Sequence, residues 1–159
     1  MTPGTSAQGT GIGKCAVAAI FDDPVAAALF AEYAEECSNP VSGSPLPVRA
    51  VYETLEQAGA AQCFAAYQAG ALAGFAFVLK TVRPDFGMRY ATVERMFAAQ
   101  RSRGEGLGTE LMRAIEADAI EAGCEAIYYS APAGSRLARL LFLSKGCRKT
   151  NEIFTKRLP

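Results

Sequence analysis

Three glycines alternate with other residues in a short segment between two apolar patterns. Gly104, Gly106 and Gly108 follow an Arg-Ser-Arg run that begins at Arg101, and they precede a stretch with helical apolar spacing. Residues without a Cβ let the backbone come close to a bulky anion. The first turn of a helix adds unpaired amides and the positive end of its dipole, and the two arginines add charge. The pattern predicts a phosphate-binding loop, and the simpler interpretation is a tight connection that needs flexible residues.

Two common nucleotide-binding loops do not fit this segment. A Walker loop needs Lys followed by Ser or Thr after its last glycine, and Leu107-Gly108 offers neither. The earlier run at residues 11–14 has Gln8 where that motif needs a glycine. A dinucleotide-binding fingerprint reads G-x-G-x-x-G, whereas this segment reads G-x-G-x-G and comes late in the chain.

The elements that must position this loop are predicted from apolar periodicity and from Gly and Pro breaks. Strands are expected at residues 14–21, 62–67, 72–81, 89–97, 126–130 and 153–158, and helices at about residues 24–36, 48–58, 106–122 and 135–145. The three middle strands have short connections, which indicate an antiparallel meander. The crossover after them should make strands 89–97 and 126–130 parallel. We therefore expect one α/β (α+β) domain, with a mixed, mostly antiparallel sheet of about six strands and helices on both faces.

Composition excludes several kinds of chemistry. Sixteen basic and sixteen acidic residues among 159 leave no net charge to attract nucleic acid or anionic lipid. No apolar run reaches the roughly 20 residues of a membrane span. The five cysteines form no CxxC pair, and residues 1–12 resemble a disordered leader rather than a secretory signal, so we expect a cytoplasmic protein with reduced thiols. Since there is no histidine, Ser-His-Asp and Cys-His catalysis and His-ligated metals are excluded.

The loop resembles a known signature. Arg101-x-x-Gly104-x-Gly106 matches the R/Q-x-x-G-x-G/A motif of the Gcn5-related N-acetyltransferases, the GNAT superfamily. Residues 68–75 are similar to the second hairpin of that family, and residues 135–146 to its penultimate helix. The order of the expected elements also matches, so the resemblance spans about residues 14 to 158. It implies a GNAT-like domain over residues 13–159 that transfers an acetyl group from acetyl-coenzyme A, without a metal, directly to a primary amine of a small molecule or protein.

The resemblance also implies a set of cofactor-binding residues at the end of strand 89–97, in the loop and on helix 135–145. They are Met96, Phe97, Ala98, Arg101, Ser102, Arg103, Gly104, Glu105, Gly106, Leu107, Gly108, Thr109, Ser135, Ala138 and Phe142. In the family, a backbone amide at the splayed end of the fourth strand polarises the thioester, and residues 96–98 supply the candidates here. The Glu105 side chain is expected to face solvent, because a carboxylate would repel the pyrophosphate.

Proton transfer has several candidates. Glu94 is a carboxylate inside an apolar strand, and it either faces the cleft as the catalytic base or points outward as a solvated group. The family's general acid is a tyrosine on the penultimate helix, and Phe142 at that position cannot donate a proton. Ser144, Tyr128, Tyr129 and water are the alternatives. Ser135 stands where the family often has Asn, and it either lines the site or caps its helix.

The sequence does not select one class of acceptor. An acidic set on the first two helices would suit a cationic amine, although charged residues are also normal on exposed helices: Glu32, Glu35, Glu36, Glu53 and Glu56. Arg83, Arg89 and Arg95 would instead favour an anionic acceptor.

The sequence is also compatible with functions other than catalysis. A coenzyme A-binding sensor or partner module without turnover is the main alternative, and Phe142 favours it. An acyltransferase that acts on nucleic acid has no support from the net charge. The last strand lacks a hairpin partner, and such open edges are often covered by a second subunit, so a homodimer is predicted.

Overall fold

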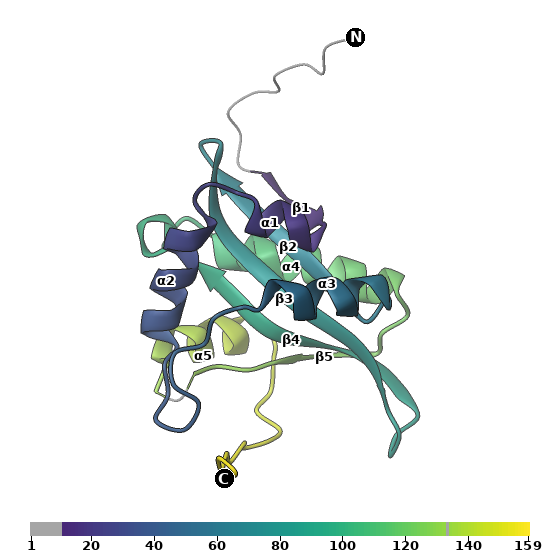
Figure 1. Cartoon of the computed structure of the whole chain (residues 1–159). Helices are drawn as coiled ribbons and strands as arrows, with labels where there is room; N and C mark the ends of the chain where they lie inside the picture. Colours follow the sequence, from purple (N-terminus) through teal and green to yellow (C-terminus); the bar gives the residue numbers. More distant parts are fainter. Residues whose placement is uncertain (1–10, 133) are drawn as a thin grey trace.

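The predicted meander forms the middle of a five-stranded sheet (Figure 1). The computed structural model describes residues 11–132 and 134–159. The strands are β1 (Gly11–Cys15), β2 (Ala61–Gln68), β3 (Ala71–Arg83), β4 (Met88–Ala98) and β5 (Ala126–Tyr129), and they are neighbours in that order. The first four run antiparallel to one another, and β5 is parallel to β4. The mixed, mostly antiparallel sheet is thus confirmed, with five strands rather than about six.

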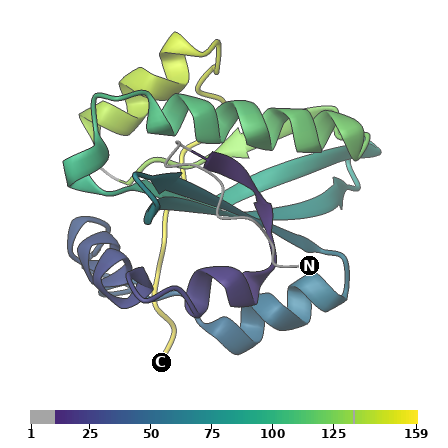
Figure 2. The same cartoon turned by 90° about the horizontal axis from the view of Figure 1, so that it is seen from above.

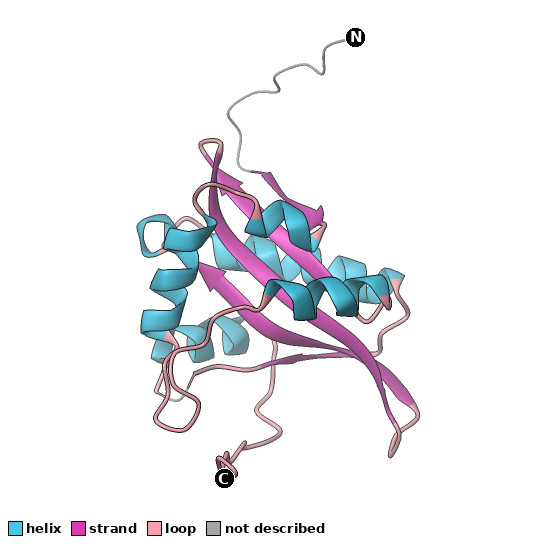
Figure 3. Ribbon diagram, in the orientation of Figure 1, coloured by secondary structure: helices cyan, strands magenta, loops and turns pink. Residues whose placement is uncertain are grey.

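Helices cover both faces of the sheet (Figure 2). One face carries α1 (Val17–Phe21), α2 (Ala26–Glu36) and α3 (Arg49–Gln57), and the other carries α4 (Leu107–Glu121) and α5 (Arg136–Ser144). Figure 3 separates these helices from the strands by colour. Among the described residues, no helix combines the length and the apolar composition that a membrane crossing requires.

The first predicted strand is wrong beyond Cys15, because residues 17–21 form α1. Val17 and Ile20 are fully buried, and Phe21 packs against the same cluster. This spacing of three and four residues places all three side chains on one side of a helix, whereas a strand would point them to both faces. Glu56 of α3 accepts a hydrogen bond from the Val17 amide (2.9 Å), so a distant residue supplies the cap for this short helix.

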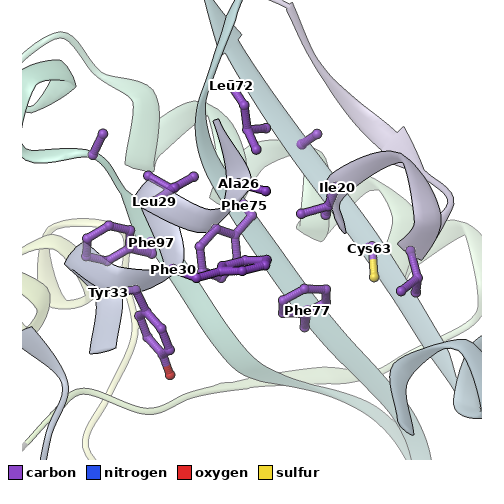
Figure 4. Packing of buried hydrophobic residues seen from close by; sticks show 13 residues of the cluster. Ile20, Ala26, Leu29, Phe30, Tyr33, Cys63, Leu72, Phe75, Phe77 and Phe97 are labelled. Atoms are coloured by element: carbon purple, nitrogen blue, oxygen red, sulfur yellow. The ribbon is translucent and has the colours of Figure 1, made fainter. Parts of the chain in front are cut away.

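Two apolar clusters fill the spaces between the sheet and the helices on its two faces. Under α2, the rings of Phe30 and Tyr33 meet Phe75 edge-on, with centroid distances of 5.2 and 5.6 Å (Figure 4). On the opposite face, Leu111 and Ile115 of α4 are buried against the sheet, as their spacing predicts. The sheet is therefore packed on both sides.

Gly74 of β3 lets α4 approach the sheet closely. A Cβ at this position would lie 2.8 Å from the Phe97 carbonyl oxygen and 3.3 Å from Leu107 Cδ2. Since the β4 backbone cannot yield easily at 2.8 Å, only glycine fits here without a shift of β4 and of the Leu107 side chain. The contact sets the distance between the sheet and the start of α4, where the predicted loop ends.

The two ends of the chain differ from the prediction. Residues 147–159 contain no helix or strand, so the predicted strand 153–158 is wrong, and Ile153 and Phe154 are almost fully exposed. Alternating side chains form a strand only against a partner, and β5 pairs with β4 alone among the described residues. Most of the predicted leader, residues 1–10, lies outside the described residues. Gly11 and Ile12, however, pair with β2, so the domain begins before residue 13.

Candidate active site

The two parallel strands part several residues before the predicted loop begins. Pairing between β4 and β5 runs from Tyr90 opposite Ala126 to Val93 opposite Tyr129. Strand β4 continues to Ala98, so its last residues have no strand neighbour on this side within the described part of the chain. The loop and α4 follow directly, and the divergence leaves room between them and α5.

A cavity of about 400 Å³ occupies this position. Its walls are the end of β4, the glycine loop, the first turn of α4, and α5. All of the predicted cofactor-binding residues except Arg101 and Glu105 line it: Met96, Phe97, Ala98, Ser102, Arg103, Gly104, Gly106, Leu107, Gly108, Thr109, Ser135, Ala138 and Phe142.

Arg101 and Glu105 have other partners. The Arg101 guanidinium donates a hydrogen bond to the Leu72 carbonyl oxygen (3.0 Å). The Glu105 carboxylate accepts one from the Gln68 amide. Both side chains therefore hold the loop to the β2–β3 hairpin, and the structure does not bring them to the cavity.

The backbone of the loop is shaped by two glycines. Gly104 and Gly106 have φ angles of 82° and 83°, a left-handed conformation that other residues rarely adopt. Gly106 is the N-cap of α4, and the Glu110 amide makes a helical bond to its carbonyl oxygen (3.0 Å). The amides of residues 107–109 precede that bond and have no acceptor within the helix, so they are available to an anion.

The Ser102 hydroxyl, like the free amides of the loop, lacks a hydrogen-bond partner in the described part of the chain. Its side chain is fully buried and lines the cavity. Within the described residues, its Oγ has no hydrogen-bond partner. An unpaired buried hydroxyl is costly, and a ligand oxygen in the cavity would remove that cost. The residues present therefore fit an oxygen-rich anionic group.

Arg103 forms the cationic edge of this cavity. Its guanidinium pairs with Glu36 of α2 (2.7 Å) and lies over the Phe97 ring, 5.4 Å from the centroid. The Gln100 amide also donates to Glu32 of α2. These contacts tie α2 to the predicted anion-binding loop.

Helix α5 closes the cavity with apolar contacts. Ser135 caps the helix, since its Oγ accepts a hydrogen bond from the Ala138 amide (3.3 Å), and it also lines the cavity. Phe142 stacks on Tyr129, with ring centroids 5.0 Å apart. The Phe142 side chain can pack against a ligand but has no proton to give.

None of the three alternative hydroxyls lines this cavity in the described part of the chain. Ser144 donates to the Leu141 carbonyl oxygen (2.7 Å). Tyr128 is bonded to the Arg83 guanidinium. The Tyr129 hydroxyl is buried without a partner among the described residues, and burial raises the pKa of this phenol. Water therefore stays the simplest proton source for a leaving group here.

Glu94 lies in a second cavity, on the face that carries α2 and α3. Val93 pairs with Val78 and Arg95 pairs with Phe77, so Glu94 is the extra residue of a β-bulge. A bulge redirects side chains that would otherwise alternate. As a result, Glu94 and Arg95 both line one cavity of about 310 Å³. Glu94 is half-buried and lines this smaller cavity, and it does not line the larger one.

Most of the predicted acidic set is engaged within the chain. Glu36 pairs with Arg103, and Glu53 pairs with Arg49 (2.7 Å). Glu32 and Glu56 accept backbone hydrogen bonds. These contacts favour a structural role for the four carboxylates over a cationic-acceptor site.

Neither a reactive thiol at Cys15 or Cys63 nor a metal-binding cluster is found among the described residues. All five thiols are free, and burial raises the pKa of Cys15 to about 11 and also raises that of Cys63, so these thiols are protonated at neutral pH. In the part of the chain that the structure describes, no three His, Cys, Asp or Glu side chains are grouped to hold a metal ion.

Comparison with known families decides the assignment. A sequence model of the Acetyltransferase (GNAT) family matches residues 26–141, which include α2 to α4 and every residue that lines the two cavities except Phe142. The chain belongs to the GNAT family. The family's enzymes are acyltransferases that use acetyl-coenzyme A as co-substrate.

Solved structures share the GNAT fold at low sequence identity. A ribosomal-protein-alanine N-acetyltransferase from Brucella melitensis biovar Abortus 2308 is 21% identical, with a TM-score of 0.71 and coverage of 94% of this chain and 100% of that one. An aminoglycoside acetyltransferase, meta-AAC0020 from a soil metagenomic sample, solved with sisomicin, is 16% identical, with a TM-score of 0.74 and coverage of 94% and 97%. No curated protein matches the sequence. At these identities the likeness shows the fold alone.

Proposed function

We propose that this GNAT protein is an N-acetyltransferase that moves the acetyl group of acetyl-coenzyme A to a primary amine of a small molecule or protein, within a ternary complex. The observation that carries the proposal is the larger cavity, where free amides of residues 107–109 and the unpartnered Ser102 hydroxyl border the same space. Such a space suits the pyrophosphate of coenzyme A.

The rest of the co-substrate would follow the end of β4. The pantetheine arm would lie along residues 96–98, against Ala138 and Phe142 of α5. The thioester would then reach the place where β4 leaves β5 after Val93. A backbone amide of residues 96–98 would donate to the carbonyl oxygen as negative charge develops there.

The chemical step is a direct displacement. The amine nitrogen attacks the carbonyl carbon, the C–N bond forms, and the C–S bond breaks with its electron pair going to the thiolate sulfur. Glu94 would take the proton that the amine must lose, directly or through water. Water would protonate the thiolate, because Phe142 has no acidic group. Holding both reactants side by side supplies much of the rate.

A calorimetric titration with acetyl-coenzyme A tests this proposal. The wild type should bind, and Gly104→Asp should weaken binding by tenfold or more, because the added carboxylate repels the pyrophosphate. Gly123→Asp is the matched control: Gly123 has a similar positive φ (74°), no atom within 4 Å of its Cβ position, and no place in either cavity. Absence of binding in the wild type, or equal loss in both variants, contradicts the proposal.

A coenzyme A-binding module without turnover is the second candidate function. The missing acid at Phe142 favours it. Binding of acetyl-coenzyme A without release of coenzyme A, over a broad screen of amines, would support the module. The homodimer and the cytoplasmic location stay predictions from the sequence, and light scattering tests the first.

A further inference from the structure

The smaller cavity has a mostly apolar wall. It lies between β4, α3 and the segment before α3. Leu46, Val48 and Val51 line it while each is more than half exposed, so three large apolar side chains gather at its rim. The rings of Tyr33 and Tyr52 also line it. Exposed apolar groups gathered around a hollow are typical of a binding surface.

One acidic and one basic side chain line this mostly apolar cavity. The bulge brings Glu94 and Arg95, which are adjacent in sequence, to the same cavity. Within the described residues neither side chain forms an ion pair, and the Arg95 guanidinium donates only to the Glu94 carbonyl oxygen. A carboxylate and a guanidinium are therefore both available, side by side, to an incoming molecule.

The larger cavity reaches the same face of the sheet. Met96 packs toward α4 and Phe97 toward α2, yet both line it, so it extends across β4 to the α2 side. There it is bordered by Glu36 and Cys37, one helical turn beyond Tyr33 of the smaller cavity. A molecule in the smaller cavity would thus lie next to the predicted thioester position.

We propose, on the basis of the proposed function, that the acceptor is a free α-amino acid with an apolar side chain. Its amino group would lie beside Glu94, its carboxylate would bind Arg95, and its side chain would enter the apolar wall. An α-amino acid carries both charges on one carbon, which matches two adjacent residues of opposite charge. The volume of about 310 Å³ is at the small end of ligand sites.

Other amines fit this set of groups less well. A polyamine would bring further positive charge to Arg95, and a simple apolar amine would leave that guanidinium without an anion. A sugar would place many hydroxyls against a wall that offers few polar partners. The Tyr33 and Tyr52 phenols are protonated at neutral pH, because burial raises the pKa of Tyr33 to about 12 and also raises that of Tyr52, and so they add no negative charge.

Equilibrium binding to the full chain tests the inference without relying on turnover. The probes are L-leucine, L-leucinamide and 3-methylbutylamine, titrated calorimetrically with and without coenzyme A. We expect L-leucine to bind at least tenfold more tightly than the two probes that lack a carboxylate. Arg95→Gln should remove this preference. Arg89→Gln, a loss of charge at an exposed position on the same strand, should keep it.

The outcomes separate this inference from the proposed function. Equal or tighter binding of the two carboxylate-free probes, or an unchanged preference in Arg95→Gln, overturns the inference, and the wild-type comparison holds even if a variant fails to fold. If acetyl-coenzyme A binds while L-leucine does not, the proposed function stands and the amino-acid acceptor is rejected. If L-leucine binds with the expected preference but acetyl-coenzyme A does not, the pocket assignment stands and the proposed acetyl transfer fails.

Discussion

At the scale of single residues, Ser102 is the most informative side chain of the loop. The resemblance places it among the cofactor-binding residues, but the signature Arg101-x-x-Gly104 accepts any residue at this position and so does not require a hydroxyl there. The structure buries it completely with an unpaired Oγ among the described residues. A hydroxyl kept in this state costs stability unless a ligand pairs with it.

Ser102→Ala is therefore expected to weaken the binding of acetyl-coenzyme A without lowering the stability of the ligand-free protein. Loss of one hydrogen bond to a charged ligand should weaken acetyl-coenzyme A binding by about 1.5 kcal/mol, roughly tenfold. The melting temperature of the ligand-free protein should stay the same or rise, because no internal hydrogen bond is lost. Calorimetry and thermal unfolding check the two parts. A lower melting temperature with unchanged affinity would show that Ser102 acts only in packing.

At the scale of elements, α1 exists because α3 supports it. Five residues are too few for a stable isolated helix, because ordering the first turn costs more conformational free energy than its hydrogen bond contributes. Val17 and Ile20 are buried under the sheet, and Glu56 accepts the hydrogen bond of the first helical amide. The helix thus depends on residues almost forty positions away.

Removing this cap should destabilise the protein without touching either cavity. Glu56→Ala is expected to lower the free energy of unfolding by about 1 kcal/mol, the usual cost of losing an N-cap. Glu56→Gln keeps an acceptor oxygen and should cost clearly less. Chemical denaturation of both variants checks the difference. Equal losses would mean that the charge of Glu56 matters rather than its hydrogen bond to Val17.

At the scale of the whole molecule, one buried carboxylate joins three elements. Asp118 of α4 is 7% exposed, and it contacts Lys80 of β3 (2.7 Å) and Lys14 of β1 (3.0 Å). Burial by itself raises the pKa of this carboxyl, but hydrogen bonds from Lys80 and Lys14 outweigh it and bring the pKa below its ordinary value of 3.8. The cluster ties α4 to both an edge and the centre of the sheet.

The sign of the shift gives a pH dependence. A carboxyl whose pKa is lowered in the folded state stabilises the fold at pH values above 3.8, the ordinary pKa. This stability is lost as the pH falls from 3.8 through the pKa of the folded state. Asp118→Asn should cost about 2 kcal/mol at pH 7 and should flatten the loss of stability in acid. Unfolding measured from pH 7 down to about pH 2 checks both effects. Glu121→Gln, at an exposed carboxylate 3.7 Å from Lys14, should behave like the wild type.

The sequence by itself determined the features that depend on local pattern. The apolar spacing of α4, the Gly breaks of the meander and the crossover to β5 follow from periodicity and turn chemistry, and the structure contains them all. The glycine loop was predictable because its residue types are rare outside special backbone conformations. Gly104 and Gly106 have the positive φ that such glycines allow.

The tertiary structure decided the features that depend on a contact with a distant segment of the same chain. Val17 and Ile20 became helical because of Glu56 and the sheet below them, and residues 153–158 form no strand because none of the described strands pairs with them. The bulge at Glu94 follows from the register against β3, which no local pattern encodes. Arg101, a motif residue, is held by Leu72 across the hairpin. In each case the deciding energy comes from a contact between segments distant in sequence, and so only the folded chain reveals it.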